Sequence, residues 1–128
     1  MNLPIKFQRI EGAAIFSAAT FMYFDSGLSW IWYVLLLFAF DIFMLGYLIN
    51  DKLGAYFYNL GHTYLIPSII VILYLLANNK ILLGLACLWF AHIGLDRALG
   101  YGLKLTTSFQ DTHLGKIGKN RGNKLFKY

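Results

Sequence analysis

Four long apolar segments constrain the fold of this chain more than any other feature. They cover residues 7–24, 29–49, 56–77 and 81–99, and short polar stretches separate them. A membrane-spanning helix needs about 20 predominantly apolar residues, so the length of each segment suits one crossing of a bilayer. We therefore predict an all-α, polytopic membrane protein that forms a bundle of four transmembrane helices.

The composition agrees with a fold whose solvent is partly lipid. Hydrophobic residues make up 59% of the 128 residues and charged residues only 13%, whereas a soluble domain carries about 25% charged residues. A chain this apolar could not cover a globule with polar surface. Its length suits one domain, which we place at residues 1–104, followed by a basic cytoplasmic tail at residues 105–128.

The basic residues predict the orientation of the helices. If the N-terminus is cytoplasmic, every Lys and Arg except Lys80 lies on the cytoplasmic side, so the positive-inside rule places both termini in the cytoplasm. Basic residues gather at the end of the chain, where we expect them to bind the anionic head groups of membrane lipids. They are Lys116, Lys119, Arg121, Lys124 and Lys127. Nucleic acid is a weaker candidate partner, because no folded nucleic-acid motif accompanies them.

Polar residues within or just after the apolar segments mark a candidate site. On the predicted topology they share one layer in the cytoplasmic half of the membrane. They are Asp41, His62, His92, Asp96, Asp111 and His113. Charged groups in hydrocarbon are costly unless they are paired, so such residues normally face the interior of the bundle and mark a function.

The spacing of His92 and Asp96 is the sharpest local signal, because residues i and i+4 share a helix face. An imidazole and a carboxylate so placed can bind one metal ion. His62 and His113 could complete a site of mixed nitrogen and oxygen ligands, and Asp111 and Asp41 are alternate ligands. Such a ligand set suits zinc, manganese or iron.

The leading hypothesis is a divalent metal site that opens to the cytoplasm and hydrolyses a lipid-like ester or phosphoester. A bound metal would lower the pKa of its water and so supply the nucleophile. Asp41 or Asp111 would act as general base. Arg97, helped by Lys104, would hold a phosphate or carboxylate group of the substrate.

Two other classes of function remain open. The same residues could bind protons or cations for transport, in a homodimer because four helices leave little room for a closed path. A variant of this class places haem between His62 and His92. Alternatively, the polar layer is a hydrogen-bond network that fixes helix register, with Asp41 paired to Arg97 and the basic tail recruiting a partner or anionic lipid.

Three stretches of the sequence resemble a known family. They are WFAHIGLDRALGYGLK at residues 89–104, FQDTHLG at residues 109–115, and GHTY at residues 61–64 with Pro67 nearby. Together they resemble the signature of the domain-of-unknown-function 4260 family of small bacterial integral membrane proteins. The resemblance implies a bacterial membrane protein of this size and implies no activity. With the topology predicted above, we expect a multi-pass protein of the bacterial cytoplasmic (inner) membrane. A looser similarity to membrane-embedded metal hydrolases rests on the His92–Asp96 spacing alone.

Overall fold

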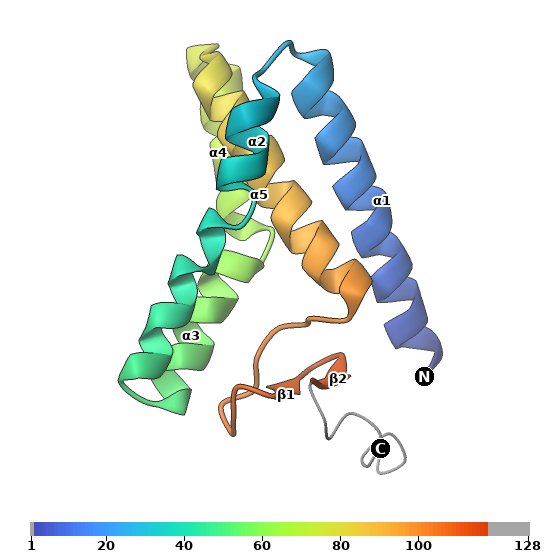
Figure 1. Ribbon diagram of the computed structural model, residues 1–128, viewed down its shortest axis with the longest axis vertical. Coiled ribbons are helices and arrows are strands. Elements are labelled where there is room, and N and C mark those ends of the chain that lie inside the picture. The colour runs from blue at the N-terminus through green and yellow to red at the C-terminus, as the bar shows by residue number, and fades with distance from the viewer. Residues whose placement is uncertain (1, 118–128) are drawn as a thin grey trace.

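The computed structural model describes residues 2–117, and these residues are mostly helical (Figure 1). The helices are α1 (Leu3–Asp25), α2 (Trp30–Leu36), the 3₁₀-helix η1 (Ala39–Leu48), α3 (Asp51–His62), α4 (Leu65–Ala77) and α5 (Lys80–Leu99). Strands β1 (Asp111–Thr112) and β2 (Gly115–Lys116) pair antiparallel in a short hairpin. The predicted all-α class is confirmed. Of the basic residues predicted in the tail, Lys119, Arg121, Lys124 and Lys127 lie outside the described residues.

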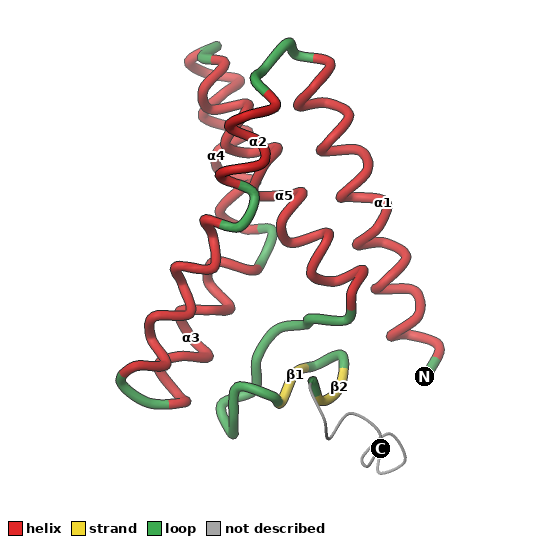
Figure 2. The backbone as a smooth tube through the Cα atoms, in the orientation of Figure 1, coloured by secondary structure: helices red, strands yellow, loops and turns green. Residues whose placement is uncertain are grey.

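Two of the predicted membrane helices are each interrupted near the middle. The segment at residues 29–49 divides into α2 and η1, and the segment at residues 56–77 belongs to α3 and α4 with a break at residues 63–64 (Figure 2). Pro67 does not cause the second break, because it lies in the first turn of α4, where its missing N–H costs no hydrogen bond. Breaks at membrane depth are tolerated only where other groups satisfy the freed backbone.

Side-chain caps set the beginnings of the helices. The side-chain oxygen of Asn50 accepts a hydrogen bond from Leu53 N (2.8 Å), which starts α3 earlier than the predicted residue 56. Asn79 caps α5 in the same way through Ile81 N (2.9 Å). At the other end of α5, Gly100 adopts a left-handed conformation with φ of 92°, which favours glycine and ends the helix.

Helix α5 lies at the centre of the fold. It packs against α1 on one side and α4 on the other, while η1 pairs with α3 (Figure 1). Where α1 and α5 cross, a Cβ atom added to Gly94 would lie only 2.7 Å from the carbonyl oxygen of Gly12. The two backbones can come this close because both residues lack a side chain. Helix α5 thereby becomes the most buried helix, and it carries three of the candidate site residues, His92, Asp96 and Arg97.

Three helical stretches within residues 2–117 are long and apolar enough, by length and composition, to cross a membrane. They are Trp30–Leu48, Asp51–Ala77 and Lys80–Leu99, and they correspond to the last three predicted segments. Helix α1 is of similar length but carries Lys6, Arg9 and Glu11 in its first half. Its membrane crossing stays a prediction, as does the orientation of the termini.

The chain after α5 folds back under the helices (Figure 1). Asn59 of α3 holds it through two hydrogen bonds, from Asn59 Nδ2 to Lys104 O (2.9 Å) and from Lys104 N to Asn59 Oδ1 (2.6 Å). Further along, His113 Nδ1 accepts from Leu103 N, and His113 Nε2 donates to Gln8 Oε1 of α1 (each 2.8 Å). Residues 101–117 are therefore tied to both α1 and α3.

Replacing Gly94 by valine should destabilise the fold by about 1–3 kcal/mol, because the new side chain would separate α1 from α5. Thermal unfolding in mild detergent would measure the loss. Ala14→Val, on an exposed face of α1, is the matched control and should leave the melting temperature unchanged. An equal decrease of the melting temperature in the two variants would show that the α1–α5 crossing does not limit stability.

Candidate metal centre

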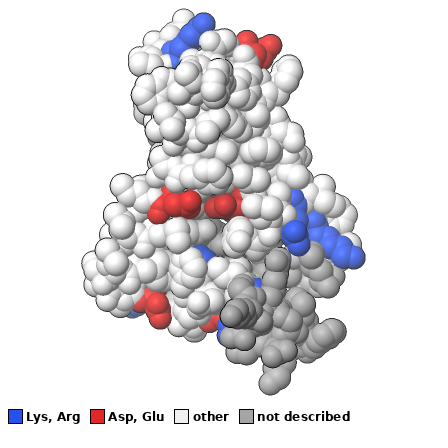
Figure 3. Space-filling view, viewed as in Figure 1, with Lys and Arg blue, Asp and Glu red and all other residues white. Residues whose placement is uncertain are grey.

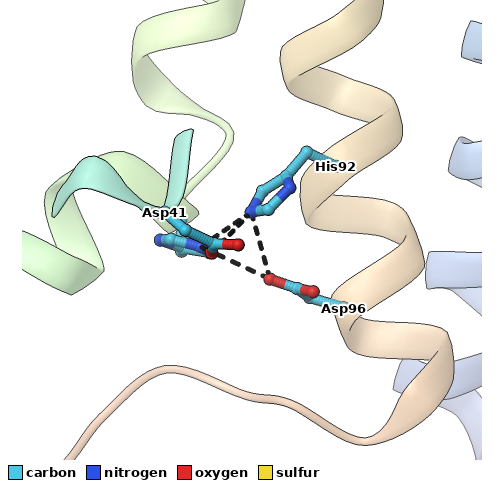
Figure 4. A group of neighbouring side chains, drawn as sticks. Asp41, His92 and Asp96 are labelled. Carbon is cyan, nitrogen blue, oxygen red and sulfur yellow. Dashed lines mark hydrogen bonds and ion pairs between the residues drawn. The ribbon is translucent and has the colours of Figure 1, made fainter. Parts of the chain in front are cut away.

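Four polar side chains from three segments converge where the two helices are interrupted. Asp41 comes from η1, His62 from the end of α3, and His92 and Asp96 from successive turns of α5. One nitrogen or oxygen atom of each residue lies within 4.8 Å of those of the other three. Figure 4 shows Asp41, His92 and Asp96 directed towards a common centre. The structure thus brings together four residues that the sequence analysis singled out.

The distances within this cluster resemble the edges of a tetrahedron. Each histidine Nε2 atom lies 3.3 to 3.4 Å from one oxygen of Asp41 and from one oxygen of Asp96. Ligand atoms at 2.0–2.1 Å from a tetrahedral zinc ion are about 3.3 Å apart. The two Nε2 atoms of His62 and His92 are closer, at 2.9 Å, which is a hydrogen-bond distance.

Backbone carbonyls determine which nitrogen of each imidazole faces the cluster. His62 Nδ1 lies 2.8 Å from Tyr58 O, and His92 Nδ1 lies 2.7 Å from Leu37 O. A carbonyl oxygen can only accept a hydrogen bond, so both Nδ1 atoms carry a proton. In the neutral rings both Nε2 atoms therefore present lone pairs to the cluster. The same N–H to carbonyl bond commonly orients histidines that ligate metals.

Four acceptors consequently meet with no donor among them when both imidazoles are neutral. Two are nitrogen lone pairs and two are carboxylate oxygens. His62 and His92 are 3% and 0% exposed to solvent, so little water screens the charges around their rings. Such a group is stable only around a cation. That cation is either a metal ion or a proton shared with an imidazole.

The helix breaks supply the carbonyls that α5 binds. In η1 the backbone N–H of Asp41 bonds to Phe38 O, which leaves Leu37 O available to His92. At the end of α3, Trp89 Nε1 donates to Gly61 O at 2.7 Å and Arg97 Nη2 to His62 O at 3.5 Å. Side chains of α5 thus satisfy carbonyl groups at both interruptions.

Aromatic packing holds the two imidazoles, while the cluster stays accessible at Asp41. Tyr58 stacks on His62 with ring centroids 3.8 Å apart and an angle of 6° between the rings. Phe40 lies beside His92, with centroids 5.6 Å apart. The side chain of Asp41 is 41% exposed, against 16% for Asp96. Figure 3 shows acidic side chains at the surface about halfway along the molecule, with a recess beneath them.

Two of the other predicted site residues, His113 and Asp111, lie outside the cluster in the chain after α5. His113 uses both ring nitrogens in bonds to Leu103 and Gln8. Asp111 accepts a hydrogen bond from Thr107 Oγ1 (2.5 Å) and faces Lys116 Nζ (3.8 Å). Both belong to the hairpin region, whose pairing with the chain after α5 holds them beneath the helices.

Arg97 also has a different position from the one expected. Its guanidinium carbon lies 4.8 Å from the centroid of the Tyr64 ring, at the break between α3 and α4. Asp41 faces the two histidines, so the alternative of an Asp41–Arg97 pair is not found. Tyr58, which the sequence analysis did not single out, supports His62 from one turn earlier in α3. The i, i+4 spacing of these two aromatic rings is the signal that could have identified it.

The geometry does not accommodate haem between His62 and His92. An iron atom with one axial histidine on each face needs the two Nε2 atoms about 4 Å apart, at roughly 2 Å per metal–nitrogen bond. The observed separation is 2.9 Å. The flat macrocycle would also have to pass between the two carboxylates.

The hydrogen bonds predict two tautomer classes among the three histidines. His62 and His92 should carry their proton on Nδ1, whereas His113, whose Nδ1 accepts from Leu103 N, should carry it on Nε2. Nitrogen NMR of histidine-labelled protein in detergent distinguishes the tautomers by the shifts of the two ring nitrogens. Titration with zinc should then move only the Nε2 signals of His62 and His92. An Nε2 proton on both of these rings in the neutral form would contradict the hydrogen-bond assignment.

Comparison with known proteins supplies a family. No curated protein and no solved structure is significantly similar to the chain. One family model, described as a domain of unknown function (DUF4260), matches residues 5–117, which include every residue of the cluster and the hairpin. The resemblance noted in the sequence is thereby confirmed, and the chain belongs to the DUF4260 family.

Proposed function

We propose that this protein is a membrane-embedded, metal-dependent hydrolase. In this proposal His62, His92 and Asp96 hold one divalent ion of zinc, manganese or iron, and Asp41 is the general base. The substrate is a lipid-like ester or phosphoester. The observation that carries the proposal is the convergence of four acceptor atoms around a space in which both imidazoles present lone pairs.

The division of roles follows from burial and position. His62, His92 and Asp96 are the well-buried members of the cluster, and two of them belong to one helix. Two histidines and one carboxylate are a common catalytic ligand set that leaves coordination positions for water and substrate. A bound ion would lower the pKa of water and polarise the bond to be hydrolysed. Asp41 lies on the opposite segment and is partly exposed, which supports the role of proton acceptor that we propose for it.

The surroundings of the cluster favour an amphipathic substrate. The three stretches that suit membrane crossing contain all four cluster residues, and apolar side chains cover much of their outer surface. A soluble substrate would have to leave water to reach a centre in this position. A lipid-like molecule can approach from the bilayer with its polar group directed to the carboxylates.

The metal content of the purified protein tests the proposal first. We expect near-stoichiometric zinc, manganese or iron in wild-type protein purified in mild detergent without chelator, and none in His92→Ala. His113→Ala is the matched control, because both ring nitrogens of His113 bond elsewhere. It should retain the metal. Elemental analysis by mass spectrometry measures all three proteins, and a metal-free wild type that takes up none of these ions in solution would refute the proposal.

Asp41→Asn separates a catalytic centre from one that only holds a metal. If Asp41 is the general base, the variant should keep its metal but lose about 10²–10⁴-fold in hydrolytic rate. The assay follows product formation by mass spectrometry from bilayers of a bacterial polar lipid extract, with and without chelator. Loss of the metal in Asp41→Asn would instead make Asp41 a fourth ligand, as in closed structural sites.

A second candidate function, cation or proton binding for transport, is favoured by one specific observation. The distance of 2.9 Å between His62 Nε2 and His92 Nε2 suits a hydrogen bond, so without metal one of these nitrogens carries a proton. Binding of a metal must displace that proton. The same four residues could therefore exchange a metal ion for protons.

Proton release on metal binding would test this exchange. Zinc added to metal-free protein in weakly buffered solution should release at least one proton per ion bound, because Nε2 cannot carry both a proton and a metal. His92→Ala should release none. Metal-driven proton flux in proteoliposomes, absent in Asp41→Asn, would favour transport over hydrolysis. Metal binding without proton release would show that both Nε2 atoms are already unprotonated.

A further inference from the structure

The ammonium group of Lys104 is buried in an aromatic environment without a carboxylate beside it. The residue is 4% exposed. Its Nζ atom donates a hydrogen bond to Phe109 O at 2.8 Å and lies 3.8 Å from the centroid of the Phe109 ring. Within residues 2–117, no carboxylate lies at ion-pair distance from it. Lysines are seldom buried to this degree unless they are paired.

The backbone around Lys104 is held so that its side chain stays inside. Asn59 bonds to both the N–H and the carbonyl of Lys104, and the residue forms a bridge with Thr112 of the hairpin. Burial lowers the pKa of Lys104 to about 8, while the negative charge of Asp96 acts in the opposite direction. A carbonyl and the faces of two rings compensate only part of the lost hydration of an ammonium group.

Lys104 lies close to the candidate metal centre. Its Nζ atom is 4.8 Å from the centroid of the Tyr58 ring, and Tyr58 stacks on His62 at 3.8 Å. The ammonium group and one of the proposed metal ligands therefore contact the same aromatic ring.

We propose that Lys104 binds the anionic group of the substrate, a phosphate or a carboxylate, next to the centre formed by His62, His92 and Asp96. This inference rests on the proposed function and names the substrate class as an anionic one. An ammonium has three N–H donors, and the protein accepts from one of them at Phe109 O. An anion would accept from the others and neutralise the buried charge.

The sequence pointed first to Arg97 for this role. In the structure the guanidinium of Arg97 lies over Tyr64 and donates to His62 O, so it stabilises the break between α3 and α4. Lys104 is instead a buried cation that has no carboxylate at ion-pair distance among the described residues. We therefore assign anion binding to Lys104, in the chain after α5, and not to Arg97, near the end of α5.

Binding of inorganic phosphate to the detergent-purified, metal-loaded protein tests the assignment. Titration calorimetry should show at least a tenfold weaker affinity for phosphate in Lys104→Met than in wild type. Lys52→Met, which removes an exposed lysine from α3, is the matched control and should bind phosphate as wild type does. Equal phosphate affinity in Lys104→Met and wild type would overturn the inference.

A second measurement keeps the test valid if Lys104→Met does not fold. In wild-type protein, phosphate should slow reductive methylation of Lys104 at least severalfold, with Lys52 unaffected, as read by peptide mass spectrometry. Unchanged methylation of Lys104 would overturn the inference. The source of the phosphate is identified by comparing bilayer discs that contain phosphatidic acid with discs of phosphatidylcholine alone. Protection of Lys104 in the phosphatidic acid discs without added phosphate indicates a lipid head group. Protection of Lys104 only by added phosphate indicates a soluble anion.

Metal analysis of the same samples separates the two proposals. Full metal content without phosphate protection would refute the role of Lys104 and leave the metal centre intact. If phosphate still protects Lys104 in metal-free His92→Ala, the result would support anion binding by Lys104. Absence of metal from the wild-type protein would separately count against the proposed hydrolase.

Discussion

A peptide carbonyl in an apolar environment must find a donor, and this requirement joins the parts of the molecule. Two helices of membrane length are interrupted, and the carbonyls freed there are bound by side chains of α5. His92 donates to Leu37 O and Trp89 donates to Gly61 O. The bond that satisfies Leu37 O also fixes the tautomer of His92, so the same contact holds the fold together and directs a lone pair into the cluster.

The cluster is best understood as a problem of charge. Two carboxylates and two imidazole nitrogens approach one another in a largely buried place, and three of the four residues have little contact with solvent. Repulsion among acceptors in such surroundings is strong because little water screens it. The fold can hold this arrangement only because a cation reduces the repulsion. In the proposed function a metal ion would compete with a proton for this position, and that competition would link metal affinity to pH.

Much of the fold and part of the candidate site could be predicted from the sequence. Apolar runs of membrane length identify helices, and costly residues within them, such as Asp41 and His62, identify the interior. The helix breaks could not be predicted, because a 3₁₀ stretch has no distinctive sequence pattern and Pro67 lies within the first turn of α4 and not at the break. Strands of two residues are too short to show alternation, so the hairpin and the positions of Asp111 and His113 were also missed.

Helix α5 is the last helix along the chain, and this order has a consequence for biogenesis. A chain synthesised from its N-terminus presents Asp41 and His62 before His92 and Asp96 exist, so the early segments alone hold one carboxylate and one imidazole. The cluster is complete only when α5, which carries His92 and Asp96, has joined η1 and α3. Residues 101–117 can close over the end of the molecule only after that, since their bonds reach Gln8 and Asn59. A nascent chain that has not yet reached α5 therefore cannot assemble the cluster.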